Sequence, residues 1–155
     1  MIVVLCGPPA SGKSTIAREL ARRLKGSKVI TSDEFKRKTY KHVFEEAERL
    51  AGKVKYLILN GTFYKRVWQE RAREIGREKK ERVLIVRITC PLKICVERNR
   101  KRKNPIPERV VRIIHREFEE PRADTTIDTK DTSPDDAVET IIAEYWRNKE
   151  VDGEI

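Results

Sequence analysis

The stretch that decides the fold is Ile2-Val3-Val4-Leu5-Cys6-Gly7-Pro8-Pro9-Ala10-Ser11-Gly12-Lys13-Ser14-Thr15, at the start of the chain. Its first part, Ile2–Cys6, is an apolar run too short for a helix and ends at a Gly-Pro-Pro turn, which predicts a buried strand. Ile16, Leu20 and Leu24 then recur four residues apart, which predicts a helix over Ser14–Lys25. We therefore expect a strand, a tight loop and a helix in succession.

The loop between these two elements has the spacing Gly7-x-x-x-x-Gly12-Lys13-Ser14, which is the P-loop pattern. The backbone N–H groups of such a loop surround phosphate oxygens, Lys13 reaches the β- and γ-phosphates, and the Ser14 hydroxyl binds Mg²⁺. A Gly/Pro turn before an ordinary helix is the alternative. We predict that ATP is bound by Gly7, Pro8, Pro9, Ala10, Ser11, Gly12, Lys13, Ser14 and Thr15.

Strand and helix patterns alternate along the rest of the chain. Further strands are predicted at 28–31, 56–59, 83–88 and 125–128, and helices at 33–51, 65–78, 91–100, 108–120 and from Ser133 or Pro134 onward. Continuous short apolar strands are buried on both faces, which favours a parallel sheet. We predict an α/β, three-layer P-loop kinase fold with a five-stranded parallel sheet and helices on both faces. It forms one domain over residues 1–149, with a flexible tail at 150–155.

The charge balance is strongly basic. Lys and Arg number 35 against 25 Asp and Glu, which gives a formal net charge of +10. This charge favours a polyanionic partner such as RNA or DNA, and it also fits a kinase that handles only ATP and a small phosphorylated acceptor. Charged residues make up 39% of the chain. That share predicts a high-temperature source, with a merely soluble, helix-rich surface as the alternative.

The three cysteines give no pattern for zinc or disulfide bonds, because their number is odd and no CxxC pair exists. Cys6 and Cys90 end apolar runs, where cysteine acts as a small hydrophobic residue. The N-terminus lacks a signal-peptide pattern, and no apolar run approaches the ~20 residues of a membrane span. We therefore expect a cytoplasmic protein.

Two other classes of P-loop protein lack support in the sequence. A GTPase should carry Asn/Thr-Lys-x-Asp late in the chain, but Thr129-Lys130-Asp131 lacks the intervening residue. An ATP-driven motor should have a strand that ends in Asp-Glu, whereas the third predicted strand ends in Asn60 and the fourth in Thr89-Cys90. These absences favour a kinase.

Asp33 directly follows the second predicted strand. In a parallel sheet, the carboxyl end of a neighbouring strand faces the same crevice as the P-loop. A carboxylate there accepts the proton of an acceptor hydroxyl or holds a magnesium-bound water. Capping of the next helix by Asp33 or Ser32 is the alternative, and both roles can coexist.

A basic segment spans residues 97–107, which include Arg98, Arg100, Lys101, Arg102 and Lys103. An arginine-bearing lid places cations against the charge on a moving phosphoryl group and excludes water. A solvated charged helix end is the alternative. We favour Arg98 and Arg102, which share a helix face at spacing i, i+4.

Several motifs together resemble a known family. They are Ser-Asp-Glu-Phe-Lys at 32–36, Asn-Gly-Thr-Phe-Tyr at 60–64, Cys-Pro-Leu-Lys-Ile-Cys-Val-Glu-Arg-Asn-Arg-Lys-Arg at 90–102, the run from Ile106 to Pro121, and Thr-Ile-Asp-Thr at 126–129. The chain resembles the kinase domain of L-seryl-tRNA(Sec) kinase and, more distantly, polynucleotide 5′-hydroxyl kinase. Both lie in a P-loop kinase group with adenylylsulfate kinases and zeta toxins.

The resemblance implies roles for individual residues. Lys13 and Ser14 match the phosphate lysine and the magnesium hydroxyl, and Asp33 matches the aspartate that activates the acceptor hydroxyl. Lys36 falls where polynucleotide kinases bind an acceptor phosphate. Arg98 and Arg102 match lid arginines, Arg102 being the catalytic one. We accordingly expect Lys13, Asp33, Arg98 and Arg102 to be catalytic, Asp33, Lys36 and Thr62 to bind the acceptor, and Ser14 and Asp33 to hold the metal.

The sequence departs from this group in two places. The third strand typically ends with Asp-Asp or Ser-Asp, whereas here it ends Asn60-Gly61 before Thr62. The seryl-tRNA kinase also carries a C-terminal tRNA-holding domain, whereas this chain stops after its last predicted helix, so seryl-tRNA specificity is not assumed.

These observations predict an ATP- and Mg²⁺-dependent kinase that phosphorylates a hydroxyl of RNA, tRNA or a nucleotide. A small-metabolite kinase, such as an adenylylsulfate kinase, is the first alternative. A nucleotide-binding, RNA-associated module with little turnover is the second, and the missing acidic residue at Asn60 is its one indication.

Overall fold

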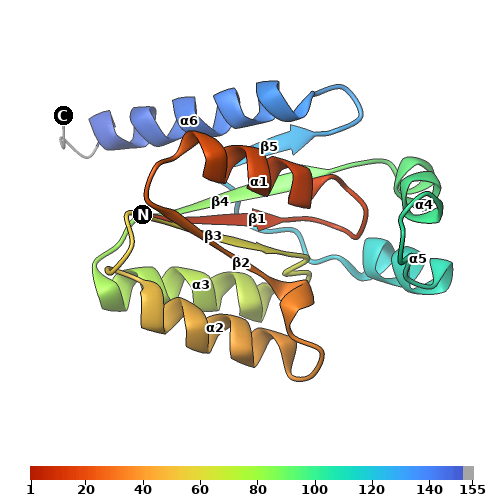
Figure 1. Ribbon diagram of the computed structural model, residues 1–155, viewed down its shortest axis with the longest axis horizontal. Coiled ribbons are helices and arrows are strands. Elements are labelled where there is room, and N and C mark those ends of the chain that lie inside the picture. Colours follow the sequence, from red (N-terminus) through yellow and green to blue (C-terminus); the bar gives the residue numbers. More distant parts are fainter. Residues whose placement is uncertain (152–155) are drawn as a thin grey trace.

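The computed structural model describes residues 1–151 and contains one five-stranded sheet (Figure 1). The strand order is β2-β3-β1-β4-β5, and every neighbouring pair is parallel. Parallel pairing confirms the predicted α/β class. The strands are β1 (Ile2–Cys6), β2 (Ser27–Thr31), β3 (Tyr56–Gly61), β4 (Val83–Thr89) and β5 (Thr125–Asp128).

Helices cover both faces of the sheet, as predicted. Figure 1 shows α1 and α6 on one face, α2 and α3 on the other, and α4 with α5 beyond one end of the strands. The helices are α1 (Lys13–Arg23), α2 (Thr39–Leu50), α3 (Arg66–Lys79), α4 (Leu92–Arg100), α5 (Glu108–Glu117) and α6 (Pro134–Val151). Among the described residues, none of these helices has the length and apolar character that crossing a membrane requires.

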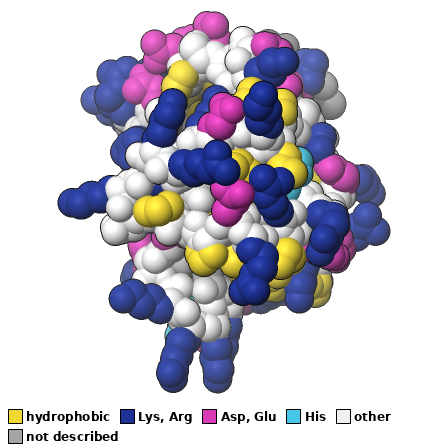
Figure 2. Space-filling view, turned by 90° about the vertical axis from the view of Figure 1, so that its right-hand side faces the viewer, with side chains coloured by type: hydrophobic (Ala, Val, Ile, Leu, Met, Phe, Trp, Pro, Cys, Tyr) yellow, Lys and Arg dark blue, Asp and Glu magenta, His cyan; other side chains and the backbone are white. Residues whose placement is uncertain are grey.

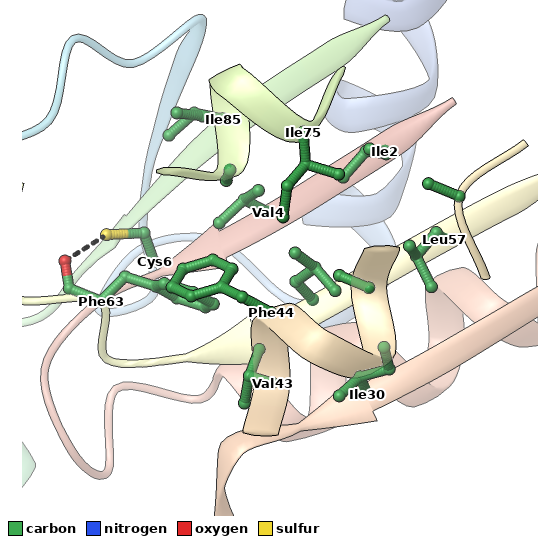
Figure 3. Packing of buried hydrophobic residues seen from close by; sticks show 14 residues of the cluster. Ile2, Val4, Cys6, Ile30, Val43, Phe44, Leu57, Phe63, Ile75 and Ile85 are labelled. Carbon is green, nitrogen blue, oxygen red and sulfur yellow. Dashed lines mark hydrogen bonds between the residues drawn. The ribbon is translucent and has the colours of Figure 1, made fainter. Parts of the chain in front are cut away.

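Two apolar clusters hold the layers together. One lies between the sheet and the pair α2 and α3, where Phe44 and Phe63 pack against the residues of β1 (Figure 3). The other lies between the sheet and the pair α1 and α6, and includes Leu20 and Ile141. Each central strand buries alternate residues in the two clusters, which is why its apolar run does not alternate with polar residues. The sheet is thereby a rigid base for the loops at its carboxyl edge.

The region after β2 differs from the sequence-based expectation. One helix was predicted over residues 33–51, but the chain forms a short 3₁₀ helix, η1 (Ser32–Glu34), and begins α2 only at Thr39. Phe35 turns inward to pack on the first cluster, and Thr39 Oγ1 donates a hydrogen bond to the Phe35 carbonyl (2.9 Å). Lys38 takes a left-handed conformation (φ 47°). The break leaves Asp33 at the carboxyl edge of the sheet instead of inside a long helix.

The end of the chain is largely as expected. The last helix begins at Pro134, where the Asp136 N–H donates to Ser133 Oγ (3.1 Å), a helix N-cap. It continues to Val151, so Glu150 and Val151, expected in the loose tail, are helical. The remaining tail residues, 152–155, lie outside the described residues.

Candidate functional site

A cleft of about 640 Å³ opens at the carboxyl edge of the sheet. The loop after β1, η1, the end of β3 and the segment after α4 all contribute to its walls. Most of the predicted site residues line it: Pro9, Ala10, Gly12, Lys13, Ser14, Thr15, Asp33, Lys36, Thr62, Arg98 and Arg102. They meet here because the carboxyl ends of parallel strands share one edge of the sheet.

The loop between β1 and α1 has the compact shape that its glycines predict. Gly12 lies in the left-handed region (φ 98°), and Ala10 shares this conformation (φ 63°). A Cβ atom on Gly7 would lie 2.3 Å from the Ile88 carbonyl oxygen of β4, so no larger residue fits at that position. The N-terminus of α1, which begins at Lys13, therefore faces the cleft with its unpaired N–H groups.

Three predicted loop residues do not line the cleft. Gly7 packs against β4, the Pro8 carbonyl oxygen accepts a hydrogen bond from Lys13 Nζ, and Ser11 is fully buried. The Ser11 carbonyl oxygen accepts hydrogen bonds from Thr129 Oγ1 (2.6 Å) and Arg98 Nη1 (3.3 Å). These residues shape the loop from behind instead of facing a ligand in the cleft.

The Lys13 side chain is nearly enclosed, with 8% of its surface exposed. Its Nζ donates to the Pro8 carbonyl oxygen (2.7 Å) and to Ser11 Oγ (3.3 Å). Burial lowers its pKa from 10.5 to about 8; the nearby thiols and the Asp33 carboxylate oppose this shift, and Arg102 adds to it. Lys13 is therefore a desolvated cation for which an anion in the cleft would compensate.

Asp33 and Lys36 lie on the wall of the cleft that β2 leads into. Asp33 is in η1 and Lys36 is in the following bend, and both side chains are exposed. The Thr31 N–H donates to the Glu34 carboxylate (3.3 Å), which secures the turn without using Asp33. The Asp33 carboxylate lines the cleft and has no hydrogen-bond or ion-pair partner among the described residues.

Ser14 contacts a residue that the sequence-based site did not include. Asn60, 3% exposed near the end of β3, donates from Nδ2 to Ser14 Oγ (3.2 Å), while its Oδ1 has no partner among the described residues. Mg²⁺ prefers oxygen ligands and keeps several waters. Ser14 Oγ, the Asp33 carboxylate and the unpaired Asn60 Oδ1 fit that ion. No cluster of three or more His, Cys, Asp or Glu within residues 1–151 offers a metal cage.

Thr62 is held by an aromatic group beneath the cleft. Its Oγ1 lies 2.8 Å from the Tyr40 hydroxyl, which also accepts the Phe63 N–H (2.9 Å). The Tyr40 ring stacks on Trp68 with centroids 4.0 Å apart. Burial raises the pKa of Tyr40, so its hydroxyl stays protonated. Tyr40 and Trp68 pack against the first apolar cluster, which secures the end of β3 beside the cleft.

Arg98 and Arg102 both reach the cleft, but not from one helix face as predicted. The helix α4 ends at Arg100, and Arg102 lies in the turn beyond it. The Arg98 guanidinium points to the loop after β1 and the end of β5, and donates to Thr129 Oγ1 (2.9 Å), the Thr129 carbonyl oxygen (3.1 Å) and the Ser11 carbonyl oxygen. Arg102 is exposed, and the described residues provide it with no ion pair.

The segment that carries Arg102 is closed by a second buried amide. Asn99, 2% exposed, donates from Nδ2 to the Ile106 carbonyl oxygen (2.7 Å), and its Oδ1 accepts the Ile106 N–H (3.1 Å). These two bonds join the ends of a loop that contains Lys101, Arg102 and Lys103. The predicted lid is thus a clamped loop on the end of α4.

A smaller cavity of about 210 Å³ adjoins the main cleft at Gly12, Thr15 and Arg98. Ile16, Thr129, Thr132 and Pro134 complete its walls. It combines an apolar side with three threonine hydroxyls and one guanidinium, the surroundings that suit a flat, polar-edged ring. It begins where the phosphate-binding loop ends, so one ligand can extend from the cleft into it.

A comparison with models of known families identifies the family of this chain. A family model described as AAA domain matches residues 2–121. The chain belongs to this family. The match covers the loop after β1 and the segment with Arg98 and Arg102, and it confirms membership in the P-loop kinase group that the sequence resembles. A search of the curated proteins finds no match.

Solved structures share the fold of this AAA domain. Kti12 of Chaetomium thermophilum, in complex with ADP-AlF3, superposes with a TM-score of 0.79 at 14% identity, over 95% of this chain and 98% of that one. A gluconokinase from Sinorhizobium meliloti 1021 gives 0.75 at 18% identity (96% and 93% covered). The APS kinase CysC of Mycobacterium tuberculosis, with AMPPNP and APS, gives 0.72 at 16% identity (93% and 96% covered). At these identities the likeness shows a kinase-like P-loop fold.

Sequence reasoning missed the roles of Asn60, Asn99 and Thr129 in this AAA domain. Two of them carried a usable signal: an amide in a buried strand and an amide inside a basic helix end are both unusual without a partner. The Thr129 contacts join residues from opposite ends of the chain, and no local pattern reports them.

Proposed function

We propose that this chain is a Mg²⁺-dependent kinase that transfers the γ-phosphoryl group of ATP to a hydroxyl of a nucleic acid or nucleotide. The observation that carries the proposal is one cleft in which Lys13 and Ser14 face Asp33 and Lys36, with unpaired cations at its mouth. The first pair suits a triphosphate, and the second suits a phosphate-bearing acceptor.

The donor would occupy the loop side of the cleft. Backbone N–H groups at the start of α1 and the Lys13 ammonium would bind the phosphates, and the neighbouring cavity at Arg98 would hold the base. Mg²⁺, held through Ser14 with Asp33 and Asn60 nearby, would neutralise charge on the β- and γ-oxygens. This arrangement agrees with the kinase-like fold of the family.

The acceptor would enter from the side of Asp33. Its hydroxyl oxygen forms a bond to the γ-phosphorus, the bond from that phosphorus to the β–γ bridging oxygen breaks, and ADP leaves. Asp33 accepts the hydroxyl proton. Arg102 would stabilise charge on the transferring group. Arg98, which donates hydrogen bonds to Thr129 and Ser11, would instead fix the position of the loop after β1 relative to the base cavity.

Unpaired positive charge lies on two loops beside the cleft, from which Lys36 and Arg102 line it. The exposed cations Lys36, Arg37 and Lys38 follow η1, and Lys101, Arg102 and Lys103 follow α4. Their side chains make no ion pair or hydrogen bond within the described part of the chain. Figure 2 views this end of the molecule, where Lys and Arg side chains predominate over Asp and Glu.

Many arginines elsewhere are neutralised by an acid. Arg22 pairs with Glu19, Arg49 with Glu46, and Arg71 with Glu48, Glu74 and Glu78. Part of the net positive charge therefore falls on the two loops beside the cleft. A phosphate backbone is a ligand for such a surface, which favours a nucleic acid over a small neutral metabolite.

The test is an acceptor screen with labelled ATP and Mg²⁺. Short RNA with a free 5′-hydroxyl, tRNA, a nucleoside monophosphate, gluconate and adenylylsulfate are offered in parallel. We expect transfer to one of the first three. We also expect at least about 100-fold less transfer in Asp33→Asn with ATP affinity unchanged, because that variant loses the general base.

The control for Asp33 is Glu34→Gln, which changes a neighbouring carboxylate that lines no part of the cleft. Transfer only to adenylylsulfate or gluconate would show that the acceptor is a small metabolite and not a nucleic acid or nucleotide. Intact ATP binding with no transfer to any hydroxyl would support the non-enzymatic alternative.

A further inference from the structure

Asn60 occupies an unusual place for an amide. It lies near the end of β3, opposite Leu5 of β1 and Thr31 of β2 in the strand register, and is 3% exposed. Its side chain reaches the floor of the cleft, where Nδ2 donates to Ser14 Oγ at 3.2 Å. The residue thus contacts the hydroxyl that we assign to Mg²⁺.

The other end of this amide is unsatisfied. Asn60 Oδ1 is the one buried side-chain polar atom in the described part of the chain that has no hydrogen-bond partner. A buried acceptor left without a hydrogen bond destabilises the fold. The unsatisfied oxygen therefore indicates a ligand-side partner in the cleft.

We propose that Asn60 is a positioning residue for magnesium: Nδ2 orients Ser14 Oγ, and Oδ1 accepts a hydrogen bond from a water bound to the ion. The inference rests on the proposed function, since it requires Mg²⁺ to bind with ATP. It assigns to a neutral amide the place where the resembling kinases have a carboxylate. The site therefore has one negative charge fewer, so its metal affinity depends on hydrogen-bond geometry.

The matched variants are Asn60→Leu and Asn60→Asp. Leucine has nearly the same size and removes both hydrogen-bonding ends, whereas aspartate keeps the shape and adds the missing charge. A satisfied buried amide supplies the control: Gln69, 2% exposed, donates to the carbonyl oxygens of Phe63 (2.9 Å) and Glu119 (2.7 Å) and lies outside the cleft. Gln69→Leu therefore tests the loss of a buried amide as such.

The measurement is the Kd of the full chain for AMPPNP by calorimetry, once with Mg²⁺ and once with EDTA. The ratio of the two values is the gain from the metal. We expect Asn60→Leu to lower this gain about 10-fold or more with the EDTA value unchanged, the usual range for partners of metal ligands. Asn60→Asp should raise the gain, because it adds a negative charge beside the ion. Gln69→Leu should leave it unchanged.

Direct binding of Mn²⁺ to the AMPPNP complex, followed by its electron paramagnetic resonance signal, gives a second readout without turnover. We expect the order of affinity Asn60→Asp, wild type, Asn60→Leu. The role of Asn60 would be overturned if wild type and Asn60→Leu gained equally from Mg²⁺, or if Asn60→Leu raised the Kd for AMPPNP equally with and without the metal. Either outcome would leave the proposed function standing. A wild-type protein that gains nothing from Mg²⁺ would overturn both.

Discussion

At the scale of single residues, Lys13 is held under the strongest electrostatic constraint in the candidate site. It is buried, its partners are one carbonyl and one hydroxyl oxygen, and burial lowers its pKa to about 8. The protein maintains this desolvated cation because the N-terminus of α1 and the compact loop hold it at the ligand position. The free-energy cost of burying this charge is offset only when an anion binds.

This constraint predicts a pH dependence of ATP binding. Phosphate binding requires the Lys13 ammonium, which the free protein loses as the pH rises through about 8. We therefore expect ATP affinity to be constant from pH 6.5 to 7.5 and to fall by up to about 10-fold per pH unit above 8. Calorimetry across this range measures the effect. Lys13→Met should bind more weakly and lose the pH dependence, and an unchanged slope in that variant would assign it to another group.

At the scale of elements, the segment after α4 depends on the Asn99 clamp. Both ends of the amide bind the backbone of Ile106, and Arg102 lies in the loop that they close. Asn99→Asp replaces the donor by an oxygen that faces the Ile106 carbonyl, so the loop should open. The structure gives the clamp no direct contact with the phosphate-binding loop, so ATP affinity should change little.

We expect two consequences of Asn99→Asp. Trypsin should cut faster at Lys101–Lys103, and phosphoryl transfer should fall about 10- to 100-fold, because a lost buried hydrogen bond amounts to roughly 1–3 kcal/mol. Arg102→Gln should lower transfer by itself and add little to Asn99→Asp. Full additivity of the two changes, or an unchanged rate of proteolysis, would show that the clamp does not position Arg102.

At the scale of the whole molecule, charge placement separates the side of the cleft that carries Asp33 and Lys36, where we propose that the acceptor binds, from the rest of the surface. Replacing Lys36, Arg37 and Lys38 together by serine should weaken binding of a short RNA. Its salt dependence should also decline by about 2 in log–log slope, as expected for three lost phosphate contacts on a single strand. Filter binding at several salt concentrations measures both, and ATP affinity should not change.

The matched control for the charge prediction replaces three other exposed lysines. Lys25, Lys53 and Lys79 lie at or just beyond the ends of α1, α2 and α3 and do not line the cleft. Replacing these three lysines by serine removes the same amount of charge from the opposite end of the molecule. Equal losses of RNA affinity in both triple variants would indicate a general field of the protein instead of a local phosphate site.

Much of the candidate site was predictable from the sequence. The P-loop spacing and the alternation of apolar strands with helices are local patterns, and they determine which side chains reach the carboxyl edge of a parallel sheet. Asp33 was placed beside the loop by that rule alone, whereas Lys36 was assigned from the family resemblance. The RNA partner rests on charge and resemblance, the cytoplasmic location on the cysteines and the lack of a signal-peptide pattern, and the high-temperature source on composition. All three stay predictions.

Other features depended on contacts that no local pattern reports. The break before α2 follows from the inward packing of Phe35, which competes with a helix that the apolar spacing also allows. The direction of Arg98 is set by Thr129, which is 31 residues away. In the same way, Asn60 meets Ser14 across 46 residues, because β3 lies beside β1 in the sheet.

The sequence by itself determined the P-loop between β1 and α1, because Gly7 and Gly12 act through local backbone geometry and Lys13 begins the helix that follows. Only the tertiary structure decided how that loop is completed: an amide with one free oxygen beside Ser14, an arginine held from the end of β5, and a clamped basic loop opposite Asp33. The physical reason is that these partners are brought together by strand order and core packing, so their hydrogen bonds exist only once the sheet has formed.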